Sequence, residues 1–157
     1  MTPPPTGAHT WLVLWRATRA MEARALDSIA GTGLGASDFA ILETLLHKGA
    51  LPVNAIGRKV LLTTGSMTSA VDRLERRGLV ARKDDADDRR VRLVHLTAEG
   101  RKLIKPAFAQ HADDLEEIVA VLTRDERATL VRLLRKLGRN AAGDGPGADE
   151  YDTEGSR

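Results

Sequence analysis

The stretch that decides the fold runs from Leu61 to Thr97 and reads LLTTGSMTSAVDRLERRGLVARKDDADDRRVRLVHLT. Its first half has apolar residues at intervals of three and four, a spacing that puts them on one face of a helix. Its second half has two short runs, residues 79–82 and 91–96, which are typical of β-strands. A charged loop separates the runs, so we expect an amphipathic helix followed by a hairpin. The apolar face of the helix consists of Met67, Ala70, Val71 and Leu74.

The expected helix has a start signal, a stop signal and a polar face of short side chains. Thr63 or Thr64 can accept a hydrogen bond from the unpaired amides of the first turn, and Gly78 suits the left-handed conformation that ends many helices. Short hydroxyls let a helix backbone approach base edges, and the amides at a helix N-terminus favour phosphate. A solvated face on an ordinary helix has the same composition, so both interpretations stay open. The polar residues are Ser66, Thr68, Ser69, Asp72 and Arg73.

The loop of the hairpin, residues 83–90, contains four aspartates and three basic residues. A carboxylate paired with an arginine can hold the guanidinium in one pose, which reduces the entropic cost of binding DNA. A charged turn that only keeps the hairpin soluble is the alternative. Together, such a helix and hairpin can place the helix in the major groove of DNA and the loop in a neighbouring groove.

Three segments in and just after this stretch resemble the winged-helix signature of the multiple-antibiotic-resistance regulator (MarR) family. Their order and their spacing match that signature without insertions or deletions. The resemblance extends over about residues 11–138. A narrower likeness joins the chain to the subgroup that represses methylhydroquinone and catechol resistance. The signature segments are Leu74–Val80, Asp88–Arg90, and Leu96-Thr97 with Gly100. The narrower likeness rests on Phe39–Glu43, His47–Gly49, Ile56-Gly57, Leu61-Leu62, Gly65–Thr68, Val71-Asp72, His111-Ala112 and Val121–Thr123.

The resemblance implies a fold, an assembly and a set of contacts. In the family, terminal helices interlock to form a dimer, and two winged helix-turn-helix lobes hang below it. A two-fold dimer matches a palindromic site in double-stranded DNA. The polar helix face would then meet bases or flanking phosphates, and Arg90 would enter the minor groove with Asp88 orienting it. The residues expected to contact DNA are Thr64, Ser66, Thr68, Ser69, Arg73, Arg77, Asp88, Arg89 and Arg90.

We expect a mainly α-helical α+β fold with a small β-hairpin wing, organised as one domain over residues 11–138. The winged helix-turn-helix is expected over about 36–97, and dimerisation helices over 11–30 and 98–138, the last of them stopped by Gly138. Residues 1–10 are expected to be flexible and 139–157 to form a disordered acidic tail. Leu130, Leu134 and Leu137 add apolar surface beyond the needs of one lobe, which favours a homodimer.

Charge and composition narrow the class of protein. Residues 141–157 carry five acids against one arginine, so the net charge of +2 divides into −4 there and +6 on the remainder, a basic body that suits phosphate binding. The absence of cysteine excludes disulfides and thiolate chemistry. No apolar run reaches the length of a membrane span, about 18 residues, and no signal peptide is visible. We therefore expect a cytoplasmic protein without a membrane partner.

The sequence predicts neither an enzyme nor a cofactor or metal site. His9, His47, His95 and His111 are scattered, and no His-Glu-x-x-His pair or glycine-rich phosphate loop is present. A metal-responsive regulator built on histidines and carboxylates is an alternative, although these residues lack ligand spacing.

Two tryptophans one helical turn apart, Trp11 and Trp15, suggest a ligand site. They can form a flat slot that stacks an aromatic compound, with Arg16 or His9 meeting an acidic or phenolic group. Equally, both can be anchors of the core or of the dimer interface. Counted back from the second helix, Trp11 stands near the position where peroxide-sensing relatives carry a reactive cysteine, which this chain lacks. We expect a non-covalent phenol, quinone or aromatic acid as the ligand.

These observations together predict a dimeric repressor of a pseudo-palindromic operator that a small aromatic ligand releases. A metal-responsive or ligand-independent DNA-binding protein is the alternative within the same class. A ligand-binding or metal-binding protein without a role at DNA is the competing class.

Overall fold

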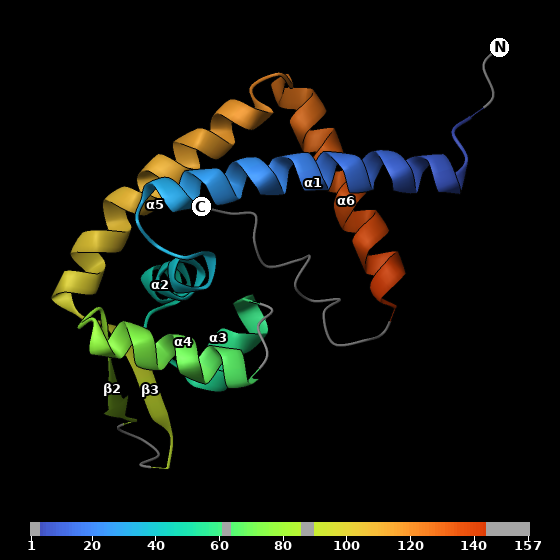
Figure 1. Cartoon of the computed structure of the whole chain (residues 1–157). Coiled ribbons are helices and arrows are strands. Elements are labelled where there is room, and N and C mark those ends of the chain that lie inside the picture. Colours follow the sequence, from blue (N-terminus) through green and yellow to red (C-terminus); the bar gives the residue numbers. More distant parts are fainter. Residues whose placement is uncertain (1–3, 61–63, 86–89, 144–157) are drawn as a thin grey trace. The chain divides into compact units, whose positions relative to one another are not determined.

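The computed structural model of the chain describes residues 4–60, 64–85 and 90–143, with the backbone alone described at residues 64 and 65. Contacts divide the chain into two compact units, Met1–Leu115 and Glu116–Arg157. The predicted mainly α fold with a β wing is confirmed. The elements are α1 (Gly7–Gly31), α2 (Ala36–Lys48), β1 (Leu51–Pro52), α3 (Val53–Val60), α4 (Thr64–Arg76), β2 (Val80–Asp84), β3 (Arg92–Leu96), α5 (Ala98–Val119) and α6 (Arg124–Ala142) (Figure 1).

The apolar core of the first unit lies where α2, α3 and α4 meet the sheet and α5. Leu42, Ile56 and Leu74 are fully buried there, each from a different helix, and Ile104 adds a fourth from α5. Burying one such side chain contributes about 1.5–3 kcal/mol. This packing fixes α4 with its apolar face inward, as its spacing predicts, and leaves its polar face outward.

The sheet has the strand order β1-β3-β2 and is antiparallel throughout. Val80 is opposite Leu96 and Arg82 is opposite Val94, so β2 and β3 form the predicted hairpin. The third strand, β1, places Leu51 opposite Val94. In the sequence, residues 51–53 indicate only a short extended link, because the two residues of β1 are too few to show the alternation of a strand. Pro52 is tolerated because β1 lies at the edge of the sheet.

The end of α4 matches the stop signal in the sequence. Gly78 has φ +70°, the left-handed conformation expected of it. The N–H of Leu79 donates to the carbonyl of Leu74 at 3.0 Å, and that of Gly78 donates to Glu75 at 2.9 Å. These two bonds are the Schellman arrangement, which satisfies the last carbonyls of a helix. The chain thereby turns directly from the end of α4 into the wing. The start signal at Thr63 and the side chain of Thr64 lie outside the described residues.

Two predicted helix boundaries are wrong. The first helix begins at Gly7, within the stretch expected to be flexible, because the side chain of Thr6 accepts a hydrogen bond from the N–H of His9 at 3.2 Å and caps the helix. The last helix continues through Gly138 to Ala142, and Gly143 ends it with φ +61°. A glycine inside a helix costs about 1 kcal/mol, which neighbouring turns can offset. Residues 144–157 of the expected tail lie outside the described residues.

The second unit consists of the end of α5, a turn and α6. Residues 123–126, Thr-Arg-Asp-Glu, have the sequence spacing of a capping box, and in the structure Thr123 caps α6 and forms that box with Glu126. Arg127 pairs with Glu116 and also donates to the carbonyl of Val119 at 3.2 Å, which ties α6 to the preceding helix. The leucines of α6 between 130 and 137 keep roughly two fifths to half of their surface exposed.

Two of the described helices, α1 and α2, are apolar enough to raise the question of membrane insertion. No single helix is long and apolar enough to cross a bilayer. Taken together, α1 and α2 are long and apolar enough to do so, but the chain bends by 83° between them. In α2 the apolar residues responsible, among them Phe39, Ile41 and Leu45, are buried in the core.

Candidate nucleic-acid interface

The outward face of α4 presents short hydroxyl side chains. Ser66, Thr68 and Ser69 are exposed, whereas the neighbouring Met67 and Ala70 are 1% and 2% exposed. The buried residues hold the helix against the core, so its hydroxyl face has a fixed orientation. A helix face of this kind can approach base edges closely, because no long side chain intervenes. The spacing of the sequence alone predicts this arrangement.

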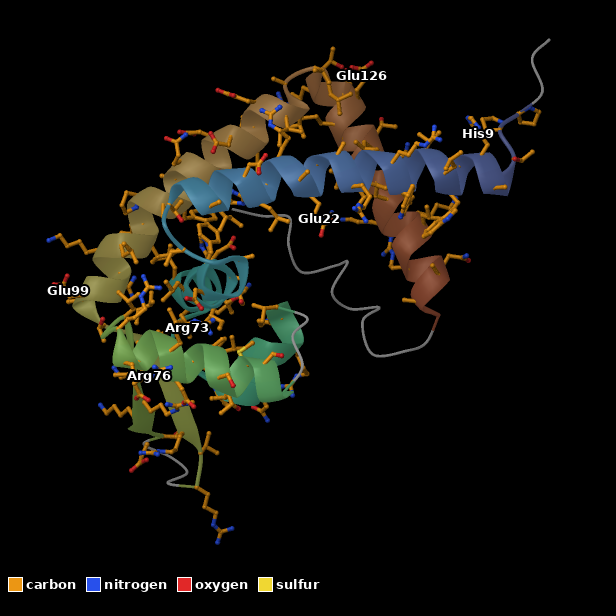
Figure 2. The ribbon with its side chains drawn as sticks, viewed as in Figure 1. His9, Glu22, Arg73, Arg76, Glu99 and Glu126 are labelled. Carbon is orange, nitrogen blue, oxygen red and sulfur yellow. The ribbon has the colours of Figure 1, made fainter. Side chains whose placement is uncertain are left out.

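A buried carboxylate ties α4 to α2. Asp38, in the first turn of α2, is 3% exposed. Arg73 donates to both of its oxygens from Nε, at 3.1 and 3.2 Å, and from Nη2 at 2.5 Å. Arg77 adds a bond of 3.3 Å. The hydrogen bonds and charge of Asp38 raise the pKa of Arg73. In Figure 2, Arg73 lies on the side of α4 that faces α2.

This pairing changes the view of two predicted DNA contacts. Arg73 and Arg77 are expected from the sequence to meet bases or phosphates, and that role stays a prediction. Both guanidinium groups already bond to Asp38, although their side chains remain 44% and 42% exposed. In the structure, both residues therefore position α4. The sequence offers no signal for the pair, since Asp38 is 35 residues from Arg73.

An arginine that sequence reasoning missed joins α4 to the wing. Arg82, on β2, pairs with Asp72 at 2.5 Å and also with Glu75, both on α4. Its backbone N–H donates to Glu75 at 3.2 Å. Burial alone would lower the pKa of Arg82, but the bonds and charges of the two carboxylates raise it. With 17% of its side chain exposed, Arg82 holds the wing strand β2 against α4.

The wing tip is described in part. The N–H of Asp85 donates to the carbonyl of Val91 at 2.9 Å and closes the hairpin. Asp84 and Arg92 form an exposed pair at 3.6 Å across the same strands. Arg90 is exposed beside this closure, at the end of the wing where a groove contact is expected. Asp88 and Arg89 lie outside the described residues, so the predicted orientation of Arg90 by Asp88 stays a prediction.

The four residues predicted to contact a ligand share the first half of α1. Trp11 and Trp15 are 66% and 48% exposed, and His9 and Arg16 are exposed as well. The guanidinium of Arg19, rather than that of Arg16, lies over the Trp15 ring at 6.0 Å. Within the first unit these residues stand on an open helix surface. Among the described residues, no three His, Asp or Glu side chains come close enough to hold a metal ion.

Known proteins match this chain in sequence and in fold. The MarR family model matches residues 34–91, which contain α2 to the wing loop. The HTH-type transcriptional regulator MhqR of Bacillus subtilis is 38% identical over 131 residues, covering 83% of this chain and 90% of MhqR.

Two solved structures extend the match. One is Bordetella bronchiseptica BpsR, whose DNA binding is regulated by 6-hydroxynicotinic acid; it is 27% identical with a TM-score of 0.71, covering 87% of this chain and 97% of BpsR. The other is a mutant MarR of E. coli complexed with operator DNA, 25% identical with a TM-score of 0.69, covering 80% of this chain and 90% of that one. The identity to MhqR over most of both chains, together with these structures, establishes that this chain belongs to the MarR family of DNA-binding transcriptional regulators.

Proposed function

We propose that the protein is a homodimeric repressor that binds a pseudo-palindromic double-stranded operator and leaves it when a small aromatic compound binds. The exposed hydroxyl face of α4, backed by the buried side chains of Met67, Ala70, Val71 and Leu74, is the observation that carries the DNA part. Arg82 and Asp38 hold this helix relative to the wing and to α2. The proposed place of action is the cytoplasm.

Footprinting of the DNA upstream of the protein's own gene tests the operator. The expected result is protection of two half-sites with their centres about 34–36 Å apart, one helical turn, because a two-fold dimer places two recognition helices in successive major grooves. Binding of the same strength to scrambled DNA would contradict the proposal and favour a protein without an operator.

The dimer is supported by the exposed leucines of α6. Leu130 and Leu134 are 43% and 39% exposed, and Leu137 is 44% exposed on the same face. The substitution Leu134→Lys places a charge in the proposed interface, whereas Ala128→Lys places one on the opposite face of the helix. Light scattering is expected to give a dimer for the wild type and Ala128→Lys, and a smaller species for Leu134→Lys. A wild-type monomer would overturn the dimer.

The ligand part is supported by BpsR, which responds to an aromatic acid, and by the exposed indoles of Trp11 and Trp15. A hundredfold loss of operator affinity requires about 2.7 kcal/mol of coupling, within the usual allosteric range. Fluorescence of the two tryptophans, measured during titration with hydroquinones, catechols and salicylate-like acids, tests their contact with ligand. Saturable quenching that tracks operator release and disappears in Trp11→Ala is expected. Release without a change at either indole would place the ligand elsewhere.

A further inference from the structure

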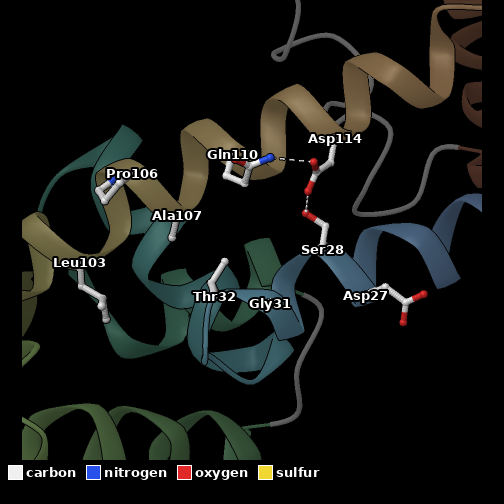
Figure 3. Close-up of a pocket in the computed structure, with 9 residues that line it drawn as sticks. All are labelled: Asp27, Ser28, Gly31, Thr32, Leu103, Pro106, Ala107, Gln110 and Asp114. Atoms are coloured by element: carbon white, nitrogen blue, oxygen red, sulfur yellow. Dashed lines mark hydrogen bonds between the residues drawn. The ribbon is translucent and has the colours of Figure 1, made fainter.

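A pocket of about 530 Å³ lies between the C-terminal part of α1 and the middle of α5, within the first unit (Figure 3). Asp27 and Ser28 line it from α1, and Gln110 and Asp114 line it from α5. It shares no residue with the tryptophan surface. Ser28 is thirteen positions from Trp15 on the same helix, which corresponds to about 20 Å along the helix axis.

The polar wall of the pocket is dominated by hydrogen-bond acceptors. The Ser28 hydroxyl donates to Asp114, and the Gln110 amide donates to the other oxygen of that carboxylate at 2.8 Å. These bonds lower the pKa of Asp114, which is therefore charged at neutral pH. Each carboxylate oxygen retains a further lone pair for an incoming donor. The lining contains a second carboxylate, Asp27, and includes no lysine or arginine.

The other wall is apolar. Leu103, Pro106 and Ala107 form it, all from α5. His111 and Arg24 also lower the pKa of Asp114 through their charges, Arg24 contributing the least, and neither residue lines the pocket. The pocket therefore combines an apolar wall, several acceptors and negative charge.

We propose that this pocket binds small ring compounds that carry hydrogen-bond donors and no negative charge, and that it excludes aromatic carboxylates. The donors would bond to Asp114 and Asp27, and the ring would lie against Leu103 and Pro106. An aromatic acid meets two carboxylates without a cation among the lining residues, so it is repelled. A ligand with acceptors alone, such as a quinone, finds few donors, because those of Ser28 and Gln110 already bond to Asp114.

Contacts lead from this pocket to α4, the recognition helix of the proposed DNA complex. Ser28 also lies 3.1 Å from Nδ1 of His111, a buried residue. The His111 ring packs edge-on against Phe39 with centroids 5.0 Å apart, and Phe39 follows Asp38, the residue that holds Arg73. A donor that draws Asp114 away from Ser28 thus acts on the packing around the first turn of α2. This regulatory consequence rests on the proposed function, whereas binding itself does not.

Calorimetry on the full chain tests the chemistry with four small probes. Catechol presents hydroxyl donors, benzylamine presents an ammonium, 1,2-dimethoxybenzene has the ring without donors, and benzoate has the ring with a negative charge. We expect catechol or benzylamine to bind about tenfold or more tightly than 1,2-dimethoxybenzene and benzoate. The loss of hydrogen bonds to the carboxylates weakens the binding of 1,2-dimethoxybenzene by about that factor, and charge repulsion does the same for benzoate. Binding of catechol alone assigns hydroxyl donors, and binding of benzylamine alone assigns ammonium. Benzoate binding as tightly as either, or no binding of either donor, overturns the proposal.

Substitutions locate the site. Asp114→Asn removes the charge but keeps an oxygen for the Ser28 hydroxyl, so we expect about tenfold weaker donor binding and weaker exclusion of benzoate. Asp113→Asn is the matched control, because Asp113 is exposed, adjacent and outside the pocket. If Asp114→Asn fails to fold, Asp27→Asn, at an exposed position of the same wall, replaces it. Equal affinities in Asp113→Asn and Asp114→Asn, with both folded, would overturn the site.

The same probes, added to the complex of the protein with its operator, distinguish ligand binding in the pocket from ligand-driven release of the operator. Donor binding that depends on Asp114 but leaves operator affinity unchanged supports the pocket and contradicts ligand-driven release. Release by catechol or benzylamine that is identical in wild type and Asp114→Asn contradicts the pocket and leaves the proposed function in place.

Discussion

Gly100 is a residue at which the fold leaves no room for a side chain. A Cβ built there would lie 1.9 Å from the carbonyl oxygen of Leu79. Thr97 explains the close approach: its hydroxyl donates to the carbonyl of Gly78 at 2.7 Å and accepts from the N–H of Gly100 at 3.0 Å. The Leu-Thr and Gly of the family signature thus fasten the start of α5 to the turn that ends α4.

Gly100→Ala is therefore expected to destabilise the protein by about 2 kcal/mol or more, because backbone must move to admit the methyl group. Gly7→Ala is the control, since a Cβ at Gly7 meets nothing within 4 Å. Chemical denaturation of both variants checks this expectation. An unchanged unfolding free energy for Gly100→Ala would contradict the packing described.

Ser28 is expected to stabilise the fold more strongly when Asp114 is charged than when it is protonated. The Ser28 and Gln110 hydrogen bonds lower the pKa of Asp114 in the folded state. A carboxyl with a depressed pKa stabilises the fold above its unfolded pKa and loses that contribution as pH falls through the folded value. Wild type should exceed Ser28→Ala in unfolding free energy at about pH 5, and the difference should shrink toward about pH 3. Urea titrations that give the same difference at both pH values would contradict this.

At the level of elements, Arg82 determines how the wing meets the recognition helix. Its bonds to Asp72 and Glu75 are the charged contacts described between β2 and α4. Arg82→Ala leaves two carboxylates facing each other without a cation, so we expect a loss of about 1–3 kcal/mol in stability and weaker operator binding. Arg101→Ala, at an exposed position of α5, is the control. Normal operator affinity and stability in Arg82→Ala would show that the wing is positioned by packing alone.

Local signals explain which elements the sequence predicts. The apolar spacing of α4, its stop at Gly78 and the capping box at Thr123 act within a few residues, so each is readable from the chain. The strand β1 depends on pairing with β3, more than forty residues later, and leaves no local pattern. The Asp38–Arg73 pair is invisible for the same reason, since composition alone shows only an arginine on a polar face.

At the level of the whole molecule, the predictable part is the DNA-binding face and the unpredictable part is the pocket. The pocket arises because Ser28 and Asp114, 86 residues apart, meet across two helices. Periodicity gives Ser28 and Asp114 no role, whereas the two tryptophans of α1 stand out in the sequence because they are rare. The negative charge of this pocket comes from carboxylates on two helices, so it can be recognised only in the folded structure.

The central claim is that α4 reads the operator and the wing supports it. The direct measurement is fluorescence anisotropy of the full chain on its operator over a range of salt concentrations, for wild type, Thr68→Ala and Arg90→Ala. Arg90→Ala should weaken binding and reduce the salt slope by about one for each phosphate that the variant no longer neutralises. Thr68→Ala should change the preference among operator variants and leave the slope unchanged. Wild-type affinity, slope and sequence preference in both variants would contradict the account.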